Sequence, residues 1–225
     1  MNRFQYLCIA PLVLLWFSST AVAGDGAELL KMGPPAKNLS ASIVKAISGN
    51  GYKVTAGGKV VCEIWLAKQW DGKAKFKPSL SVLYPFQPGE LIGVIRYLKR
   101  AGDFRDQQVK SGVYTIRYGL QPEDGNHIGT SDTRDFLVLL PPSKDKNSAR
   151  LTDMAKLFEH SAEVSQATHP AILSMLSIPA KAKAPAVRHL EERKLWSVRL
   201  VGKAKAGKSV KNLSIEFVVV GHGEE

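Results

Sequence analysis

Short runs of β-branched and aromatic residues, separated by turn-forming residues, fill the chain between residues 60 and 142. Tyr114, Ile116 and Tyr118 alternate with more polar positions, which is typical of a strand with one face toward a core and the other toward solvent. The same pattern predicts several further strands in this region. The predicted strands are 60–67, 79–84, 91–99, 112–120 and 135–140.

After Pro142 the spacing of apolar residues changes to that of a helix. Five apolar positions at i, i+3, i+4, i+7 and i+11 share one helix face. These positions are Leu151, Met154, Ala155, Phe158 and Ala162. A second, shorter helix is predicted at 170–176, where Pro170 suits the first turn because its missing N–H has no partner to lose.

The order of these elements predicts a mainly β fold. Strand patterns return at 195–201 and 213–220, which indicates a terminal hairpin joined by the Lys/Gly-rich segment 202–212. We expect an antiparallel β-sandwich, Ig-like or jelly-roll-like, with one or two short helices near 150–177. A parallel α/β fold is disfavoured because the connections between residues 67 and 135 are too polar, or too rich in Pro and Gly, to supply helices.

The first 23 residues have the pattern of a secretory signal peptide. Arg3 precedes a short apolar run over 7–17, and the small-residue motif Ala21-Val22-Ala23 follows it. An N-terminal membrane anchor is the alternative, disfavoured because the run is shorter than the ~20 residues of a membrane span. We therefore expect an exported protein, periplasmic or extracellular, without a transmembrane segment after cleavage.

The remaining chain, 24–225, is expected to form one β-sandwich domain. An irregular lead-in is predicted at 24–50 and a helical insertion at 148–178. Cleavage would remove Cys8 and leave Cys62 as the only cysteine, so no intramolecular disulfide is expected. Because Cys62 lies within a strand pattern, we interpret it as a small buried hydrophobic residue rather than a reactive thiol.

The chain is basic, with 31 Lys+Arg against 20 Asp+Glu and a formal net charge of +11. Two lysine clusters contribute to this excess: Lys68, Lys73, Lys75 and Lys77, and Lys203, Lys205, Lys208 and Lys211. One interpretation is a solubilising surface. The other is attraction to anionic envelope polymers or lipid head groups, which would weaken with salt. Nucleic acid is a disfavoured partner for an exported protein.

The segment 121–135 is a long, acidic loop between two predicted strands. Loops of this length in compact domains are often binding loops. Carboxylate and amide oxygens on a loop containing Gly are also ligands that calcium prefers, and part of the spacing fits a calcium-loop pattern. The candidate calcium ligands are Asp124, Asn126, Asp132 and Asp135. A structural loop, whose Asp and Asn side chains bond their own backbone, is the alternative.

For a ligand or glycan, the candidate binding residues combine this loop with one aromatic ring: Asp124, Asn126, His127, Arg134 and Trp70. Trp70 is expected to be exposed because it lies beside Asp71-Gly72. A transition-metal site of His127 with His160 or His169 has no support from spacing. No cofactor is expected, with calcium as the one candidate ion.

Motifs for nucleophilic, phosphate-binding, dinucleotide and metalloprotease chemistry are missing from the sequence. A hydrolase with two spatially converging carboxylates stays open, and four acids are formally available for it. These acids are Glu63, Glu90, Asp124 and Asp135.

The stretches 112–122, 124–127 and 134–137 resemble a segment found in a family of uncharacterised exported bacterial proteins. The resemblance implies an exported, β-rich protein and implies no activity or site residue. We therefore expect a non-catalytic envelope protein that binds a ligand, glycan or protein partner through the 121–135 loop. The alternatives are a hydrolase of envelope polymers and a structural periplasmic or surface protein.

Overall fold

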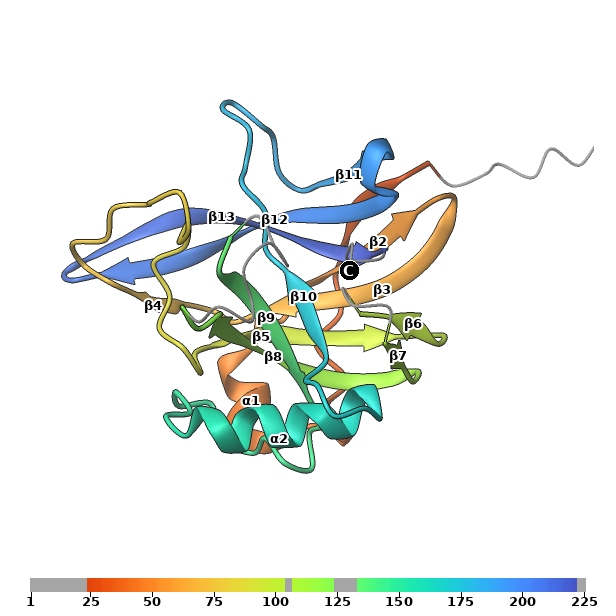
Figure 1. The fold of residues 1–225 in the computed structure, drawn as a ribbon, viewed down its shortest axis with the longest axis horizontal. Helices are drawn as coiled ribbons and strands as arrows, with labels where there is room; N and C mark the ends of the chain where they lie inside the picture. Colours follow the sequence, from red (N-terminus) through yellow and green to blue (C-terminus); the bar gives the residue numbers. More distant parts are fainter. Residues whose placement is uncertain (1–23, 104–106, 124–132, 222–225) are drawn as a thin grey trace, which may run out of the picture.

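The computed structural model describes residues 24–103, 107–123 and 133–221 (Figure 1). The fold is mainly β, as predicted, with sheets of antiparallel strands and two short α-helices in a β-sandwich-like arrangement. In the described part of the chain, no helix combines the length and apolar character that crossing a bilayer requires.

The larger sheet has seven strands in the order β1-β2-β3-β5-β8-β9-β10, all paired antiparallel. Its strands are β1 (Gly26–Leu30), β2 (Gly51–Ala56), β3 (Lys59–Leu66), β5 (Leu91–Tyr97), β8 (Gly112–Leu120), β9 (Asp135–Leu140) and β10 (Ile172–Ser174). A separate two-stranded ribbon pairs β6 (Ala101–Gly102) with β7 (Gln108–Val109). Four of the strands predicted from alternation, those at 60–67, 91–99, 112–120 and 135–140, are confirmed as β3, β5, β8 and β9.

The second sheet is built on the long hairpin of β12 (Leu195–Ala206) and β13 (Ser209–Val220). The hairpin confirms the predicted terminal pair and extends further, because its strands continue through the Lys/Gly-rich segment to a tight turn at Gly207, whose φ is +64°. β11 (Ala186–Leu190) pairs antiparallel with β12, and β4 (Trp70–Gly72) pairs parallel with β12.

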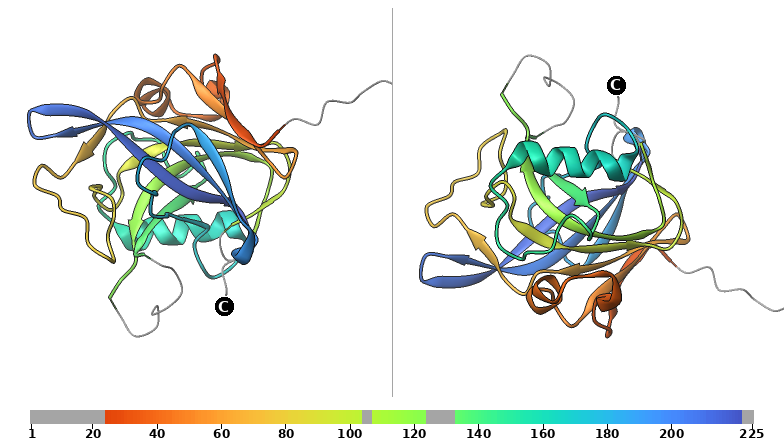
Figure 2. Two further views of the ribbon diagram at one scale, coloured as in Figure 1. Left: turned by 90° about the horizontal axis from the view of Figure 1, so that it is seen from above. Right: turned by 90° about the horizontal axis from the view of Figure 1, so that it is seen from below.

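The two sheets face one another across the main hydrophobic core (Figure 2). They touch directly where Met175, just after β10, forms an isolated bridge with Phe217 of β13. Tyr84 reinforces this seam, because its hydroxyl donates to the carbonyl of Leu176 at 2.7 Å and accepts from the backbone N–H of Glu216 at 3.0 Å. Cys62 is fully buried in this core, as predicted, and burial raises the pKa of its thiol.

Each of the two α-helices begins at a side-chain cap. α1 (Ala41–Ala46) begins after Ser40, whose side chain accepts from the backbone N–H of Ile43. α2 (Met154–Ser165) begins after Asp153, whose side chain caps it in the same way, and it confirms the helix predicted from the apolar spacing. Leu157 of α2 packs against β9 in a small separate core. Two 3-10 turns complete the chain: η1 (Ala36–Asn38) and η2 (Glu191–Arg193).

Three local expectations were wrong. The lead-in 24–50 is not irregular, since it contains β1 and α1. The segment 170–176, expected to be a helix, instead contains β10. The backbone of β10 pairs antiparallel with the free edge of β9, and the Leu139 N–H also donates to the carbonyl of Ala171. Residues 79–84 form no strand, because their backbone N–H groups are bound by the side chains of Ser79 and Asp135.

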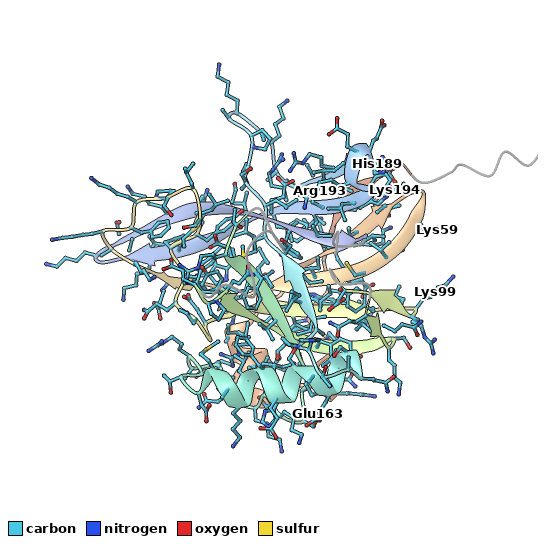
Figure 3. All side chains as sticks on the ribbon, viewed as in Figure 1. Lys59, Lys99, Glu163, His189, Arg193 and Lys194 are labelled. Carbon is cyan, nitrogen blue, oxygen red and sulfur yellow. The ribbon has the colours of Figure 1, made fainter. Side chains whose placement is uncertain are left out.

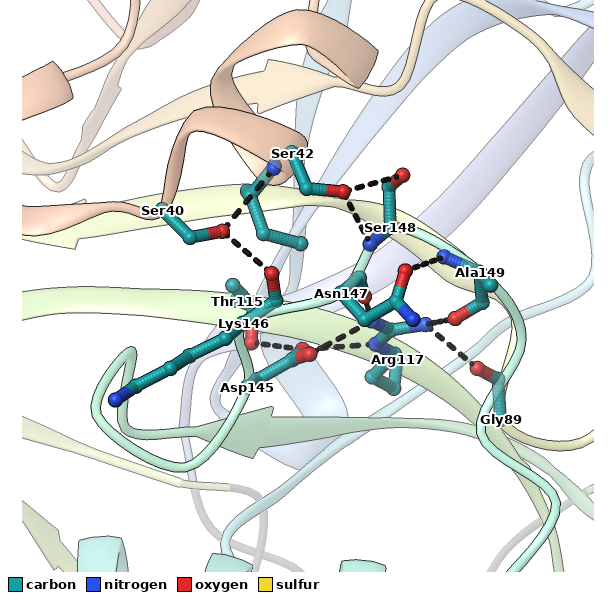
Figure 4. A network of polar contacts seen from close by, with 11 residues as sticks. Ser40, Ser42, Gly89, Thr115, Arg117, Asp145, Lys146, Asn147, Ser148 and Ala149 are labelled. Atoms are coloured by element: carbon teal, nitrogen blue, oxygen red, sulfur yellow. Dashed lines mark hydrogen bonds and ion pairs between the residues drawn. The ribbon is translucent and has the colours of Figure 1, made fainter.

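The polar face of β8 is also buried, against the expectation that it meets solvent. Arg117 and Asp145 form a fully buried ion pair at 2.7 Å, and Thr115 donates to the same carboxylate at 2.6 Å (Figure 4). The guanidinium of Arg117 also donates to three backbone carbonyls, those of Gly89, Asn147 and Ala149. This network holds the 141–150 connection over β8, so that both faces of the strand are covered.

Candidate functional site

Trp70 is an anchor of the core and not an exposed ring. Its side chain is 1 % exposed, and its indole N–H donates to the carbonyl of Ile92 at 3.0 Å. The ring packs edge-on against Phe86, with the ring centroids 5.2 Å apart. The expectation of an exposed Trp70 is therefore corrected: the turn that follows it is polar, but the indole itself points inward and satisfies its donor in the larger sheet.

Anchoring Trp70 fixes β4 beside the hairpin. Trp70 lies opposite Ala204, Asp71 opposite Lys205, and Gly72 opposite Ala206. The indole covers Gly202 so closely that a Cβ there would lie 2.3 Å from the ring. Only glycine leaves room for the ring at this position, and this close approach lets β4 lie along β12.

The pairing of β4 with β12 brings seven of the eight lysines of the two clusters to one end of the fold, although the clusters are far apart in sequence. We define the lysine lobe as residues 71–80 and 203–212. All seven of its lysines are exposed: Lys73, Lys75, Lys77, Lys203, Lys205, Lys208 and Lys211. Asp71 is the one acidic residue within the two segments. None of the seven lysines forms an ion pair with a residue that the structure describes.

The lysine lobe projects at one end of the molecule. In two perpendicular views, the tip of the β12–β13 hairpin and the loop that follows β4 extend from the same end (Figures 1 and 2). They also touch, since a Cβ on Gly207 would lie 3.6 Å from the Cβ of Ala74. Figure 3 shows nitrogen-tipped side chains spreading outward from this end, whereas Lys59 and Lys99 lie at the other. Lys68 lies outside the lobe, because its ammonium donates to the carbonyl of Lys45 near α1.

A buried carboxylate holds β4 at the base of the lysine lobe, where the segment 71–80 begins. Glu90 is 7 % exposed, and its two oxygens accept from the backbone N–H groups of Asp71, at 2.5 Å, and Gln87, at 3.1 Å. Burial outweighs these bonds and raises the pKa of Glu90 to about 7. Sequence reasoning listed Glu90 only as a formally available acid, and no local pattern indicates that it holds β4.

The predicted binding loop is described only at its two ends. Asp124, Asn126, His127 and Asp132 lie outside the described residues, so their proposed roles stay predictions. Arg134 joins the two ends of the loop, because it donates to the carbonyl of Gln121 at 2.7 Å and forms an ion pair with Glu123. These two interactions give the Arg134 guanidinium partners within the chain.

The carboxylate of Asp135 is held by hydrogen bonds inside the fold. It is fully buried and accepts from the backbone N–H groups of Leu83 and Tyr84 and from the hydroxyl of Tyr118. Burial raises its pKa, although the three hydrogen bonds oppose the shift. Among residues 24–103, 107–123 and 133–221, no three His, Cys, Asp or Glu side chains are grouped so that they could hold a metal ion.

The carboxylates considered for a hydrolase have separate partners in the described structure. Glu63 is buried and paired with Arg96 across β3 and β5. Glu90 binds backbone N–H groups at the root of the lobe, and Asp135 binds the 83–84 backbone and Tyr118. These interactions give each of the three acids a role in the fold.

Comparison with known proteins returned no match to a family model, to a curated protein or to a solved structure.

Proposed function

We propose that this is an exported, non-catalytic protein that binds a polyanionic component of the cell envelope through the lysine lobe. The observation that supports the proposal is the joining of two lysine clusters by the β4–β12 pair, with seven exposed lysines and a single acid. Bringing like charges together is unfavourable unless an opposite charge is bound, so a function explains this arrangement better than solubility does.

The form of the lobe suits an extended anion rather than a small one. Lysine ammonium groups are flexible point charges without the planar fork that arginine uses for bidentate recognition. Lys203 and Lys205 lie on one face of β12 and Lys211 on the other, so the charge surrounds the hairpin. We therefore expect binding with little chemical specificity, steered by the summed potential and weakened strongly by salt.

The test compares two variants of equal charge. In the first, Lys203, Lys205, Lys208 and Lys211 become Gln; in the control, the exposed Lys59, Lys99, Lys110 and Lys156 become Gln. Affinity for a fluorescent polyphosphate is measured by anisotropy at low and high salt. The lobe variant should bind at least about ten-fold more weakly, and the control should change less than about three-fold, because exposed charges beyond a Debye length are screened.

Equal losses in the two variants would show that only net charge matters, and would contradict a dedicated site. Export is tested separately, by isolating the protein from the envelope fraction and sequencing its N-terminus. The pattern of residues 1–23 predicts that the mature chain starts at Gly24.

A further inference from the structure

The lysine lobe carries exposed apolar side chains as well as charge. Leu80 is 97 % exposed and Val210 is 50 % exposed, and both belong to the segments that form the lobe. Phe76 lies between Lys75 and Lys77 and is partly exposed. Large apolar side chains exposed in the same two segments as the lysines suit a partner that offers an apolar phase as well as negative charge.

Leu80 is held in its exposed position by the backbone around it. The N–H of Ser79 donates to the carbonyl of Val82 at 2.9 Å, and the N–H of Val82 donates to the Ser79 hydroxyl at 3.0 Å. The next residue, Ser81, accepts from the backbone N–H of Arg134 at 2.7 Å. Leu80 therefore sits at the tip of a tight turn that is fastened to the fold, with its side chain in solvent.

Val210 is placed among the lysines by the register of the hairpin. It lies directly opposite Lys205, so these two side chains share a face, and Lys203 with its partner Asn212 shares that face two residues along. An apolar side chain thus lies on the same face as Lys205 and Lys203, whose long stems let their ammonium groups reach phosphates while the apolar part lies lower.

We infer that the lysine lobe docks on an anionic phospholipid bilayer, with Leu80 and Val210 entering the head-group region while the lysines contact the phosphates. The inference rests on the proposed function and names its partner. A soluble polyanion would pair with the lysines and leave Leu80 and Val210 in water, whereas a bilayer accommodates both. Each lysine near an anionic membrane surface raises partitioning roughly five-fold, and stable attachment needs a second, apolar contribution.

The test measures co-sedimentation of the protein with vesicles of phosphatidylglycerol and phosphatidylcholine, and with vesicles of phosphatidylcholine alone. We expect binding to the anionic vesicles only. Changing Leu80→Ser and Val210→Ser together should weaken vesicle binding by roughly ten-fold and leave polyphosphate affinity unchanged. Leu98→Ser is the matched control, because Leu98 is 49 % exposed and lies outside the lobe.

A second measurement reports insertion directly. The fluorescence that Leu80→Trp adds should be quenched by brominated lipid in anionic vesicles, and the fluorescence that Leu98→Trp adds should not. Wild-type binding to polyphosphate but not to vesicles, or vesicle binding unchanged in the double serine variant, would overturn the bilayer inference and leave the proposed function standing. Retention of both activities by the four-lysine variant would refute both.

Discussion

The Trp70 ring occupies the space that a side chain on residue 202 would need, with 2.3 Å between an ideal Cβ on Gly202 and the indole Cη2 atom. Gly202→Ala should therefore lower the free energy of unfolding by about 1–3 kcal/mol through overpacking. Removing the ring with Trp70→Ala should cost about 3–5 kcal/mol. Both are measured by denaturant titration.

The control for these changes is Gly49→Ala, because Gly49 is exposed and no atom lies within 4 Å of its ideal Cβ. That substitution should change stability by less than about 0.5 kcal/mol. A Gly202→Ala variant as stable as the control would contradict the packing of β4 described here.

Glu90 should make stability depend on pH in the direction opposite to that of an acid whose pKa the fold lowers. Its pKa is raised from 4.5 to about 7 in the fold. The folded state therefore holds its proton more tightly than the unfolded state does. The stability from this group is fully present below pH 4.5 and is lost as pH rises through 7. Asp71 opposes ionisation of Glu90 and Arg150 favours it.

The measurement is the difference in unfolding free energy between wild type and Glu90→Gln, followed from pH 5 to pH 8. Gln cannot ionise, so the wild-type advantage should shrink by up to about 3 kcal/mol as pH rises. A difference that stays constant over this range would show that the Glu90 pKa is not raised.

The Arg117–Asp145 pair should be sensitive to loss of either partner. Both side chains are fully buried, so Asp145→Ala leaves a buried guanidinium charge without its carboxylate and should cost about 3–5 kcal/mol. The exposed pair Lys144–Glu163, at 3.0 Å, is the comparison, and Lys144→Ala should cost less than about 1 kcal/mol. Similar losses for the two variants in thermal denaturation would contradict the difference in burial.

Asp135 should act in folding independently of calcium. Asp135→Asn weakens the bonds from Leu83, Tyr84 and Tyr118 and should cost about 1–3 kcal/mol. The loss should be the same with and without millimolar calcium in a thermal-shift assay. If calcium raises the melting temperature of the wild type and this rise disappears in the variant, the calcium-ligand hypothesis for Asp135 gains support.

Local sequence patterns were enough to predict the elements whose apolar residues recur with the period of a strand or a helix. The alternation over 112–120 and the apolar spacing over 151–162 both correspond to observed elements, β8 and α2. Periodicity works here because a strand or helix must turn its apolar residues to one side whatever lies against it.

Elements decided by distant partners could not be predicted in this way. Pro170 and the residues after it suit a helix, yet β9 offers them a strand partner. Trp70 stands beside a polar turn, yet its ring fills a space left open by Gly202, 132 residues further along the chain. Arg117 occupies a polar position in an alternating strand, yet the 141–150 connection buries it.

The β class, the basic charge and the two lysine clusters follow from the amino-acid sequence alone, because composition and periodicity are properties of the chain. The meeting of the two clusters at one end of the molecule depends on the tertiary fold. That outcome depends on the parallel pairing of three residues of β4 with β12, held by a buried indole and a buried carboxylate. Contacts between segments so distant along the chain leave no periodic signal in either segment, because the hydrogen-bond and packing partners of each residue lie in the other segment.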